Sequence, residues 1–241
     1  RREIQKLLTA ADFYSAECLR DWALARDLGF TGECLPVIPN AGGLDVAALR
    51  AQAGLVRPSE RRRVMVKGYS GFVGLARVAL EALEESAPYL RDFEICIYSA
   101  SFETALRAHR LRKKTGLSIR VIRKGRATHN EMLELFSGAR FYVGLSLSDG
   151  ISTSLLEAIA CGCFPIQTAT ACADEWIDPG VSGIVLNGHE IPEVTEAIRI
   201  ASTDDILVDR SFDQLMRIAA SRLSADDVGA VARDYYVRAL A

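Results

Sequence analysis

Two acidic residues at the start of an expected helix, Asp149 and Glu157, are the side chains of this sequence best placed to do chemistry. They lie in residues 146–157 (SLSDGISTSLLE), where a polar turn is followed by apolar residues at helical spacing. A carboxylate among apolar neighbours is costly to bury unless it accepts hydrogen bonds, and the vicinal hydroxyls of a ribose would donate them. We therefore expect Asp149, in the turn, and Glu157, inside the helix, to project toward one ligand. The alternative is that Glu157 pairs with a nearby arginine.

A glycine-bearing turn, residues 68–74 (GYSGFVG), offers a second place for a ligand; it follows an apolar run that ends at Lys67. Glycines let the backbone approach a ligand, and the start of the helix that follows presents free N–H groups to a phosphate. The same pattern also occurs in turns that serve packing alone. The turn does not match GxGxxG, and only Glu84 and Glu85 stand near the position of an acidic ribose ligand, about 20 residues on. A nicotinamide-dependent enzyme is therefore disfavoured.

Short β-rich runs alternate with longer helical patterns along most of the chain. The expected strands are 34–38, 63–67, 94–98, 119–122, 141–145, 164–167 and 183–186, and the helices between them are 74–86, 102–115, 130–137 and 152–161. These strands lack polar alternation, which is typical of parallel strands buried on both faces. The alternation predicts the α/β class, with a Rossmann-like, doubly wound parallel sheet that binds ligands at the carboxyl ends of its strands.

The two ends of the chain differ from this pattern. Residues 1–30 predict a helix end, a short strand at 13–14 and a helix closed by Gly29. Residues 36–40 (PVIPN) predict a rigid connector, and 45–62 a solvated helix and link. From residue 195 onward we expect helices only, broken near Asp204 and Ser224, which are both acceptable N-caps. The chain opens within a helical pattern and without Met, so we interpret it as a fragment of a longer polypeptide.

Composition excludes several classes of protein. Of the 241 residues, 49% are hydrophobic and 25% charged, with a net charge of −2; this argues against disorder, a small disulfide scaffold and a nucleic-acid-binding protein. The longest nearly apolar run, 158–166, is far shorter than the roughly 20 residues that span a bilayer. The six cysteines contain no CxxC pair, which favours reduced thiols and a cytoplasmic location. A zinc site built from Cys161, Cys163, Cys172 and His189 would lack familiar ligand spacing, and no metal is expected.

Eight positions between 146 and 165 form a longer pattern: Ser146, Gly150, Leu156, Glu157, Ala158, Ala160, Gly162 and Pro165. This pattern resembles the signature of the retaining glycosyltransferases of the GT-B fold, the glycosyltransferase family 4 group ("glycosyl transferases group 1"). That signature has the form S-x-x-E-G and then L-x-E-A-x-A-x-G-x-P, and Asp149 stands here in the place of the first Glu. Residues 39–43 and 174–183 are similar to the family's connector into the nucleotide lobe and to the segment before its last strand.

The resemblance implies an activity and a set of site residues. Such an enzyme transfers a sugar from a nucleotide-diphospho-sugar donor to a glycan or lipid-linked acceptor, with retention of configuration, in polysaccharide biosynthesis. It uses no cofactor, no metal and no protein nucleophile. Glu157 would hold the ribose hydroxyls and Asp149 would face the donor sugar, so these two acids are the catalytic candidates. The other donor-binding candidates are Lys67, Gly68, Tyr69, Gly71, Arg123, Lys124, Ser148, Gly150, Ile151, Ser152 and Thr153.

The sequence departs from the family pattern where the donor diphosphate would bind. Members of the family place an Arg directly after the glycine that follows the first strand, and a Lys five residues beyond it. Here these positions hold Tyr69 and Gly74. Lys67, Arg77 and Lys124 are the candidates to supply the missing positive charge.

The resemblance also implies a division of the chain. Residues 1–40 would be the remnant of an N-terminal acceptor lobe, 41–203 the nucleotide-sugar-binding domain, and 204–241 the helices that cross back to the first lobe. The expected partners are a nucleotide sugar and the acceptor, with no nucleic acid; peripheral membrane association would occur through the missing part of the N-terminal lobe. One alternative is a non-catalytic GT-B lobe that binds a nucleotide sugar or a protein. An epimerase of the same fold, which needs other acids, is less favoured.

Overall fold

A six-stranded parallel sheet forms the centre of the molecule in the computed structural model, which describes residues 2–39, 42–53 and 56–240. The strands lie in the order β5-β4-β3-β6-β7-β8, and two shorter strands, β1 and β2, form a separate parallel pair. The bounds are β1 (Phe13–Tyr14), β2 (Glu33–Cys34), β3 (Arg63–Lys67), β4 (Glu94–Ala100), β5 (Ser118–Arg123), β6 (Phe141–Gly144), β7 (Phe164–Thr168) and β8 (Ile184–Leu186). The predicted α/β class and Rossmann-like sheet are confirmed.

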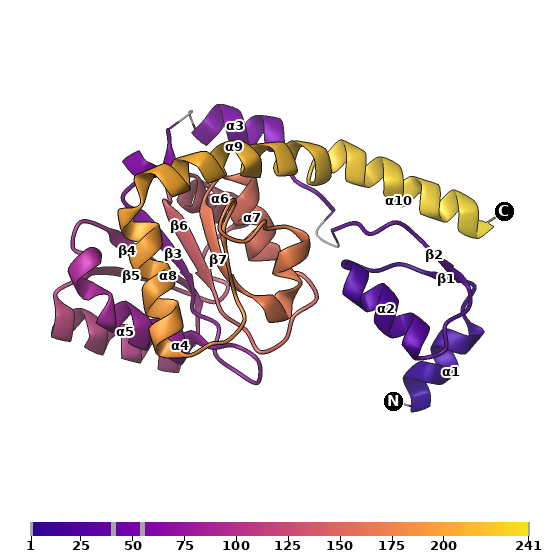
Figure 1. Cartoon of the computed structure of the whole chain (residues 1–241), viewed down its shortest axis with the longest axis horizontal. Coiled ribbons are helices and arrows are strands. Elements are labelled where there is room, and N and C mark those ends of the chain that lie inside the picture. The colour runs from indigo at the N-terminus through magenta and orange to yellow at the C-terminus, as the bar shows by residue number, and fades with distance from the viewer. Residues whose placement is uncertain (1, 40–41, 54–55, 241) are drawn as a thin grey trace.

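Helices cover both faces of this sheet (Figure 1). Their bounds are α1 (Arg2–Ala10), α2 (Leu19–Asp27), α3 (Val46–Ala53), α4 (Ala76–Glu85), α5 (Phe102–Thr115), α6 (His129–Ser137), α7 (Thr153–Ala160), α8 (Ile191–Thr203), α9 (Asp205–Arg222) and α10 (Ala225–Leu240). Helices α4, α5 and α8 pack on one face, and α3, α6 and α7 on the other, where the second half of α9 joins them. No helix in the described parts of the chain is both long and apolar enough to cross a membrane.

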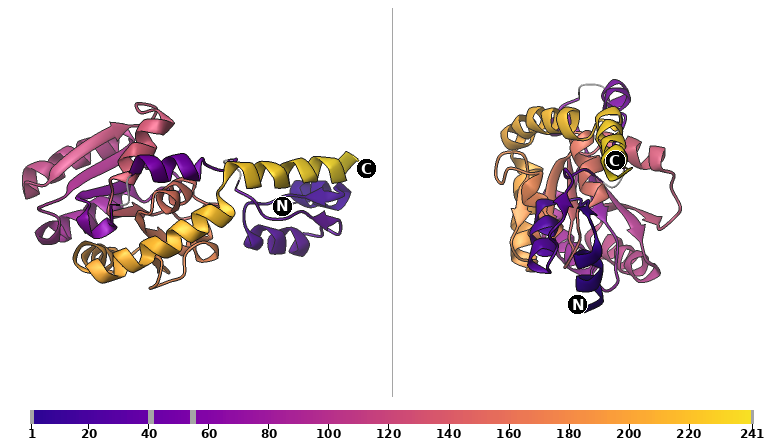
Figure 2. Two further views of the ribbon diagram at one scale, coloured as in Figure 1. Left: turned by 90° about the horizontal axis from the view of Figure 1, so that it is seen from above. Right: turned by 90° about the vertical axis from the view of Figure 1, so that its right-hand side faces the viewer.

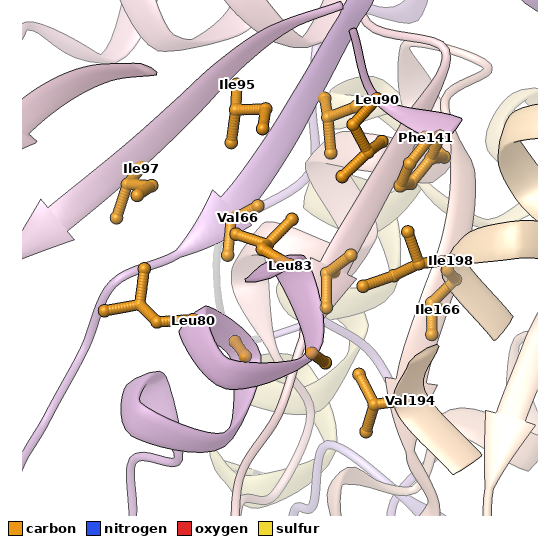
Figure 3. Close-up of a cluster of buried hydrophobic side chains, with 14 of the residues drawn as sticks. Val66, Leu80, Leu83, Leu90, Ile95, Ile97, Phe141, Ile166, Val194 and Ile198 are labelled. Atoms are coloured by element: carbon orange, nitrogen blue, oxygen red, sulfur yellow. The ribbon is translucent and has the colours of Figure 1, made fainter. Parts of the chain in front are cut away.

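The two faces of the sheet carry two hydrophobic cores, because successive side chains of a strand point to opposite sides. In β3, Val64 and Val66 join the core under α4, and Met65 joins the core under α6 and α7. Figure 3 shows the first of these cores, where Val66 lies beside Leu83 of α4. Burial on both faces explains why the strands show no polar alternation.

Local signals set the ends of the helices that matter for the site. Ser101 caps α5, its Oγ accepting a hydrogen bond from the backbone N of Thr104 at 3.1 Å. Thr128 and Glu131 form a reciprocal capping box at the start of α6. Asp204 caps α9 by accepting from the backbone N of Leu207 at 2.8 Å. Caps of this kind depend on neighbouring residues alone, so the sequence predicted these helix starts to within one residue.

The order of the strands creates a switch point between β3 and β6. The chain proceeds from β3 through β4 to β5 at one edge and then returns to place β6 on the other side of β3. All strands of this sheet are parallel, so the carboxyl ends of β3 and β6, and the starts of α4 and α7, meet at one edge. Ligands of doubly wound sheets bind at such a point.

Residues 2–39 form a small unit of α1, α2, β1 and β2 that lies beside the large sheet, with α10 running alongside it (Figures 1 and 2). The hydroxyl of Tyr235 on α10 donates to the carbonyl of Pro36, and Arg238 pairs with Glu33 at 3.1 Å. The division of the chain at residues 40/41 and 203/204 remains a proposal, and residues 40 and 41 themselves lie outside the described residues.

The expected strand at 34–38 is wrong beyond its first residue, because β2 ends at Cys34. Pro36 and Pro39 have no backbone N–H to donate to a neighbouring strand. The β-branched residues between them therefore give an extended connector.

The expectation of a solvated link at 45–62 is also corrected. Val46 and Leu49 of α3 are buried, and so is the side chain of Arg61. The Arg61 guanidinium donates to the carbonyls of Val56 (2.9 Å) and Cys161 (3.0 Å). A run of three arginines predicts exposure, but these carbonyls satisfy the guanidinium inside the protein.

Candidate functional site

The two turns singled out in the sequence lie side by side at the carboxyl edge of the sheet. Gly74 and Ser146 form an antiparallel bridge. The backbone N of Leu147 donates to the carbonyl of Val73 at 2.8 Å, and the N of Leu75 donates to the carbonyl of Leu145 at 3.3 Å. The turn after β3 and the turn after β6 are thus joined by main-chain hydrogen bonds into one platform at the switch point.

A positive charge, Lys67, lies at the end of β3 against this platform. Its Nζ donates to Ser152 Oγ at 3.1 Å and lies 3.7 Å from Asp149 Oδ2. Ser152 is buried at the start of α7, where the first N–H groups of the helix have no helical partner. The site therefore combines an ammonium group with a helix N-terminus, which together favour an anion.

The other two cations considered for this role lie elsewhere. Arg77 pairs with Glu81 at 3.1 Å on the exposed face of α4. Lys124 is exposed in the turn after β5, two strands away from β3. Of the three candidates, Lys67 is the one that the fold brings to the two turns.

Glu157 is buried in the first turns of α7 and has a histidine as its partner. Glu157 is 8% exposed, and its Oε1 lies 3.0 Å from Nε2 of His129, the first residue of α6. Burial raises the pKa of Glu157, and the nearby charges of His129 and Lys67 oppose that rise. The arginine partner considered in the sequence is thus replaced by a histidine whose side chain is 57% exposed. A ligand that binds Glu157 therefore has to displace only the solvent-exposed side chain of His129.

His129 is the functional candidate that the sequence did not reveal. It lies exposed at the start of a helix, where a polar residue needs no ligand to explain it. The capping box at Thr128 predicts where α6 begins. Only the sheet order places that helix start against α7 and Glu157. Of the other donor-binding candidates, Arg123 ends β5 and Lys124 follows it, and both are exposed.

The small N-terminal unit reaches the Asp149 turn. The Arg20 guanidinium donates to the carbonyl of Asp149 at 2.8 Å and to that of Thr170 at 3.0 Å. A Cβ atom at Gly150 would lie 2.9 Å from Glu17 Oε2, so glycine allows this close approach. The turn that carries Asp149 is therefore fixed by contacts from residues 17–20, which sequence spacing does not predict.

The remaining candidates lie around these groups. Gly68 and Ile151 are buried beneath the two turns, whereas Gly71, Ser148 and Thr153 are exposed along them. Tyr69 is exposed, and its carbonyl oxygen would lie 2.2 Å from a Cβ atom placed at Gly74. In the turn at 68–74, the two residues that depart from the family pattern, Tyr69 and Gly74, thus lie against each other.

The fold and this cluster define the chain as a Rossmann-like α/β protein with a charged site at the switch point of its sheet. Residues 76–214, more than half of the chain, match the model of the family described as glycosyl transferases group 1, and the chain belongs to this family. A comparison of the sequence with curated proteins finds no significant match.

Several solved structures share the fold of this chain. HepE from Anabaena, solved in complex with UDP-glucose, is 16% identical with a TM-score of 0.76, over 98% of this chain and 67% of its own. The pneumococcal O-GlcNAc transferase GtfA, solved with UDP and GlcNAc, is 16% identical with a TM-score of 0.77, over 99% and 47%. Sucrose-phosphate synthase from Thermosynechococcus elongatus is 17% identical with a TM-score of 0.74, over 98% and 60%. The chain thus spans 47–67% of the length of these three proteins.

Proposed function

We propose that this chain is the donor-binding part of a glycosyltransferase that takes a sugar from a nucleoside diphosphate. The observation that carries the proposal is the meeting of Lys67, Ser152, Asp149 and Glu157 at the carboxyl ends of β3 and β6. Family membership supports it, and so do the complexes of two proteins with this fold, one with UDP-glucose and one with UDP and GlcNAc.

Each group has a role that follows from its chemistry. Lys67 and the N–H groups at the start of α7 would oppose the charge of the diphosphate. Glu157, buried and an acceptor when ionised, would accept hydrogen bonds from the ribose hydroxyls, displacing His129. Asp149 would face the donor sugar. No protein nucleophile is proposed: transfer with retention would occur by attack on the same face of the sugar from which the diphosphate leaves.

We propose a glycan or lipid-linked molecule as the acceptor. The six free cysteines are typical of a reducing compartment, so we also propose that the protein acts in the cytoplasm.

A second candidate function is a lobe that binds a nucleotide sugar without transferring it. The observation that favours it is the absence of the family's diphosphate clamp, because Gly74 cannot carry a lysine without moving the Tyr69 carbonyl. Removing one charged clamp typically costs several kcal/mol of transition-state stabilisation, yet donor binding through Lys67 would persist. Both functions thus require binding of the nucleotide sugar, and only the first requires transfer of its sugar.

Titration calorimetry with UDP, GDP and ADP, and with the matching nucleosides, tests the proposal. We expect heat for at least one diphosphate. The variant Lys67→Met should weaken that diphosphate at least tenfold, because charge-assisted hydrogen bonds contribute about 1.5–3 kcal/mol, while the nucleoside is less affected. Arg77→Met, on the outer face of α4, is the matched control and should bind normally. A folded chain that gives no heat with any diphosphate would contradict the proposal.

A further inference from the structure

A group of three potential metal ligands lies where the N-terminal unit meets the large-sheet unit, outside the site described above. Cys18 is buried and is the N-cap residue of α2. Cys172 is buried between the 3₁₀ turns Ala169–Ala171 and Ala173–Glu175. The two sulfur atoms and a carboxylate oxygen of Glu175 all lie within 4.8 Å of one another. Two segments far apart in the sequence thus present three ligand atoms to one point.

The size of this group fits one tetrahedral ion. With Zn–S near 2.3 Å and Zn–O near 2.0 Å, two sulfur ligands of zinc stand about 3.8 Å apart, and a sulfur and an oxygen about 3.5 Å. Both values lie inside the 4.8 Å spread of the cluster. Two soft sulfur ligands with a carboxylate form a donor set that suits Zn²⁺ rather than Mg²⁺ or Ca²⁺.

The backbone holds Cys172 at this point in a conformation that cysteine rarely adopts. Its φ of +48° and ψ of 35° lie in the left-handed region, where a side chain with a Cβ atom is strained. The neighbouring Glu175 is fixed as well, because its carboxylate accepts hydrogen bonds from the backbone N of Leu19 (2.9 Å) and of Arg20 (3.2 Å). Two of the three ligand-bearing residues are therefore held in place before any ion arrives.

Binding of a divalent ion by two thiols leaves the net charge of this group unchanged. The charged groups that act on these residues include the Arg20 guanidinium and the Asp21 carboxylate on α2, and the Arg222 guanidinium beside Glu175. When a divalent cation binds, two S–H bonds break, two metal–sulfur bonds form and two protons pass to solvent, so the net charge is unchanged.

We propose that Cys18, Cys172 and Glu175 bind one Zn²⁺ ion, with water as the fourth ligand. The ion fastens α2 to the segment that follows β7. Thr170 in that segment donates from Oγ1 to the carbonyl of Ser146 at 2.6 Å, and its carbonyl accepts from the backbone N of Asp149 at 3.3 Å. The zinc thus steadies the Asp149 turn from outside and takes no part in a reaction.

Zinc retention tests the proposal directly. The chain is incubated with zinc and a phosphine reductant, desalted, and analysed for metal by mass spectrometry. We expect about one zinc per wild-type chain and almost none in Cys18→Ser or Cys172→Gly. Serine is a good N-cap for α2, and glycine relieves the strain at residue 172, so both variants should fold. Cys34→Ser, which changes a half-buried cysteine of β2, is the matched control and should keep its zinc.

Two further measurements identify the ligands. Co²⁺ in place of zinc should give a thiolate-to-metal absorption band in the near ultraviolet that is lost in Cys172→Gly, and Glu175→Gln should weaken zinc binding at least tenfold. Zinc should raise the melting temperature of the wild type and leave that of Cys172→Gly unchanged. Failure of the wild type to retain zinc, retention by Cys172→Gly, or a Cys18–Cys172 disulfide in protein purified without reductant would each overturn the proposal.

Discussion

At the scale of single residues, Glu157 shows how a buried carboxylate is kept available to a ligand. It is buried beside the hydrophobic core under α6 and α7, yet its partner His129 is more than half exposed. A carboxylate with a fully buried arginine partner could not be neutralised without stranding a charge. With an exposed histidine as partner, neutralising Glu157 leaves the imidazole in contact with water. Glu157 is therefore a residue whose removal should affect binding more than stability.

We predict that Glu157→Gln weakens nucleoside diphosphate binding about tenfold or more, because charge-assisted hydrogen bonds to the ribose are lost. The free energy of unfolding should change by less than about 1 kcal/mol, since the partner His129 is 57% exposed and stays solvated without the pair. Calorimetry and urea unfolding on the same variant measure both quantities. Glu81→Gln, which alters an exposed pair on α4, should change neither. A large loss of stability with unchanged binding would remove Glu157 from the site.

The pH dependence of stability gives an independent check on the burial of Glu157. Its pKa in the folded protein is raised above the ordinary 4.5, so folding favours the protonated form and loses stability as pH rises through the raised pKa. Glu157→Gln removes this loss. The variant should be at least as stable as the wild type at pH 7.5, and any advantage should shrink toward pH 4, where the wild-type side chain is neutral too. Urea unfolding across this range decides; the opposite trend would mean that an ionised pair with His129 dominates.

At the scale of elements, the turn between β3 and α4 sets what the site can hold. The turn is joined to the one after β6 by the Gly74–Ser146 bridge and to the start of α5, where Ser70 Oγ lies 2.6 Å from Ser101 Oγ. A side chain at Gly74 would meet the backbone of Tyr69 at 2.2 Å, whereas Tyr69 itself is exposed. Of the two positions that lack the family's cations, position 69 thus has room for a long side chain and position 74 does not.

We predict that Tyr69→Arg strengthens diphosphate binding, because it adds a cation at an exposed position of the turn without a clash. Gly74→Lys should instead destabilise the protein by about 1–3 kcal/mol, the usual cost of overpacking, and should not improve binding. Thermal unfolding and calorimetry on both variants test this difference. Equal gains in affinity from the two variants would contradict the geometry of the turn.

At the scale of the whole molecule, two units meet at the proposed site. The large-sheet unit supplies Lys67 from β3 and Glu157 from α7, and the small N-terminal unit reaches the Asp149 turn through Arg20. The tail helices α9 and α10 carry two acidic pairs at their starts, 204–205 and 226–227. There Asp204 caps α9, and Asp205 pairs with Arg140 at 2.6 Å. These acids serve helix ends and an ion pair, and we do not assign them to a metal of the reaction.

We predict that donor binding does not depend on Mg²⁺ or Mn²⁺, because Lys67 and the start of α7 provide the positive charge. Adding either ion to metal-free buffer should change the affinity for a nucleoside diphosphate by less than about threefold, or ~0.7 kcal/mol. Calorimetry with and without the ion measures this. An increase of tenfold or more would show that a hard cation belongs to the donor site.

The sequence alone determined the elements whose causes are local. The apolar run at 63–67 and the helical pattern at 102–115 predicted β3 and α5 with the bounds that the structure has. The glycine-bearing turns and the acids Asp149 and Glu157 were also recognised from composition and spacing. The expected strand at 34–38 is too long because Pro36 and Pro39 cannot donate backbone hydrogen bonds, and this effect is local as well.

Only the tertiary structure decided which side chains meet. Lys67 beside Ser152, His129 beside Glu157, and Cys18 beside Cys172 each join residues from segments that are distant in the sequence. The buried Arg61 belongs with them, because distant carbonyls satisfy its guanidinium. Local spacing carries no information on these pairs. These pairs are decided by the order of the strands, in which β6 returns to the other side of β3, and by the docking of the N-terminal unit.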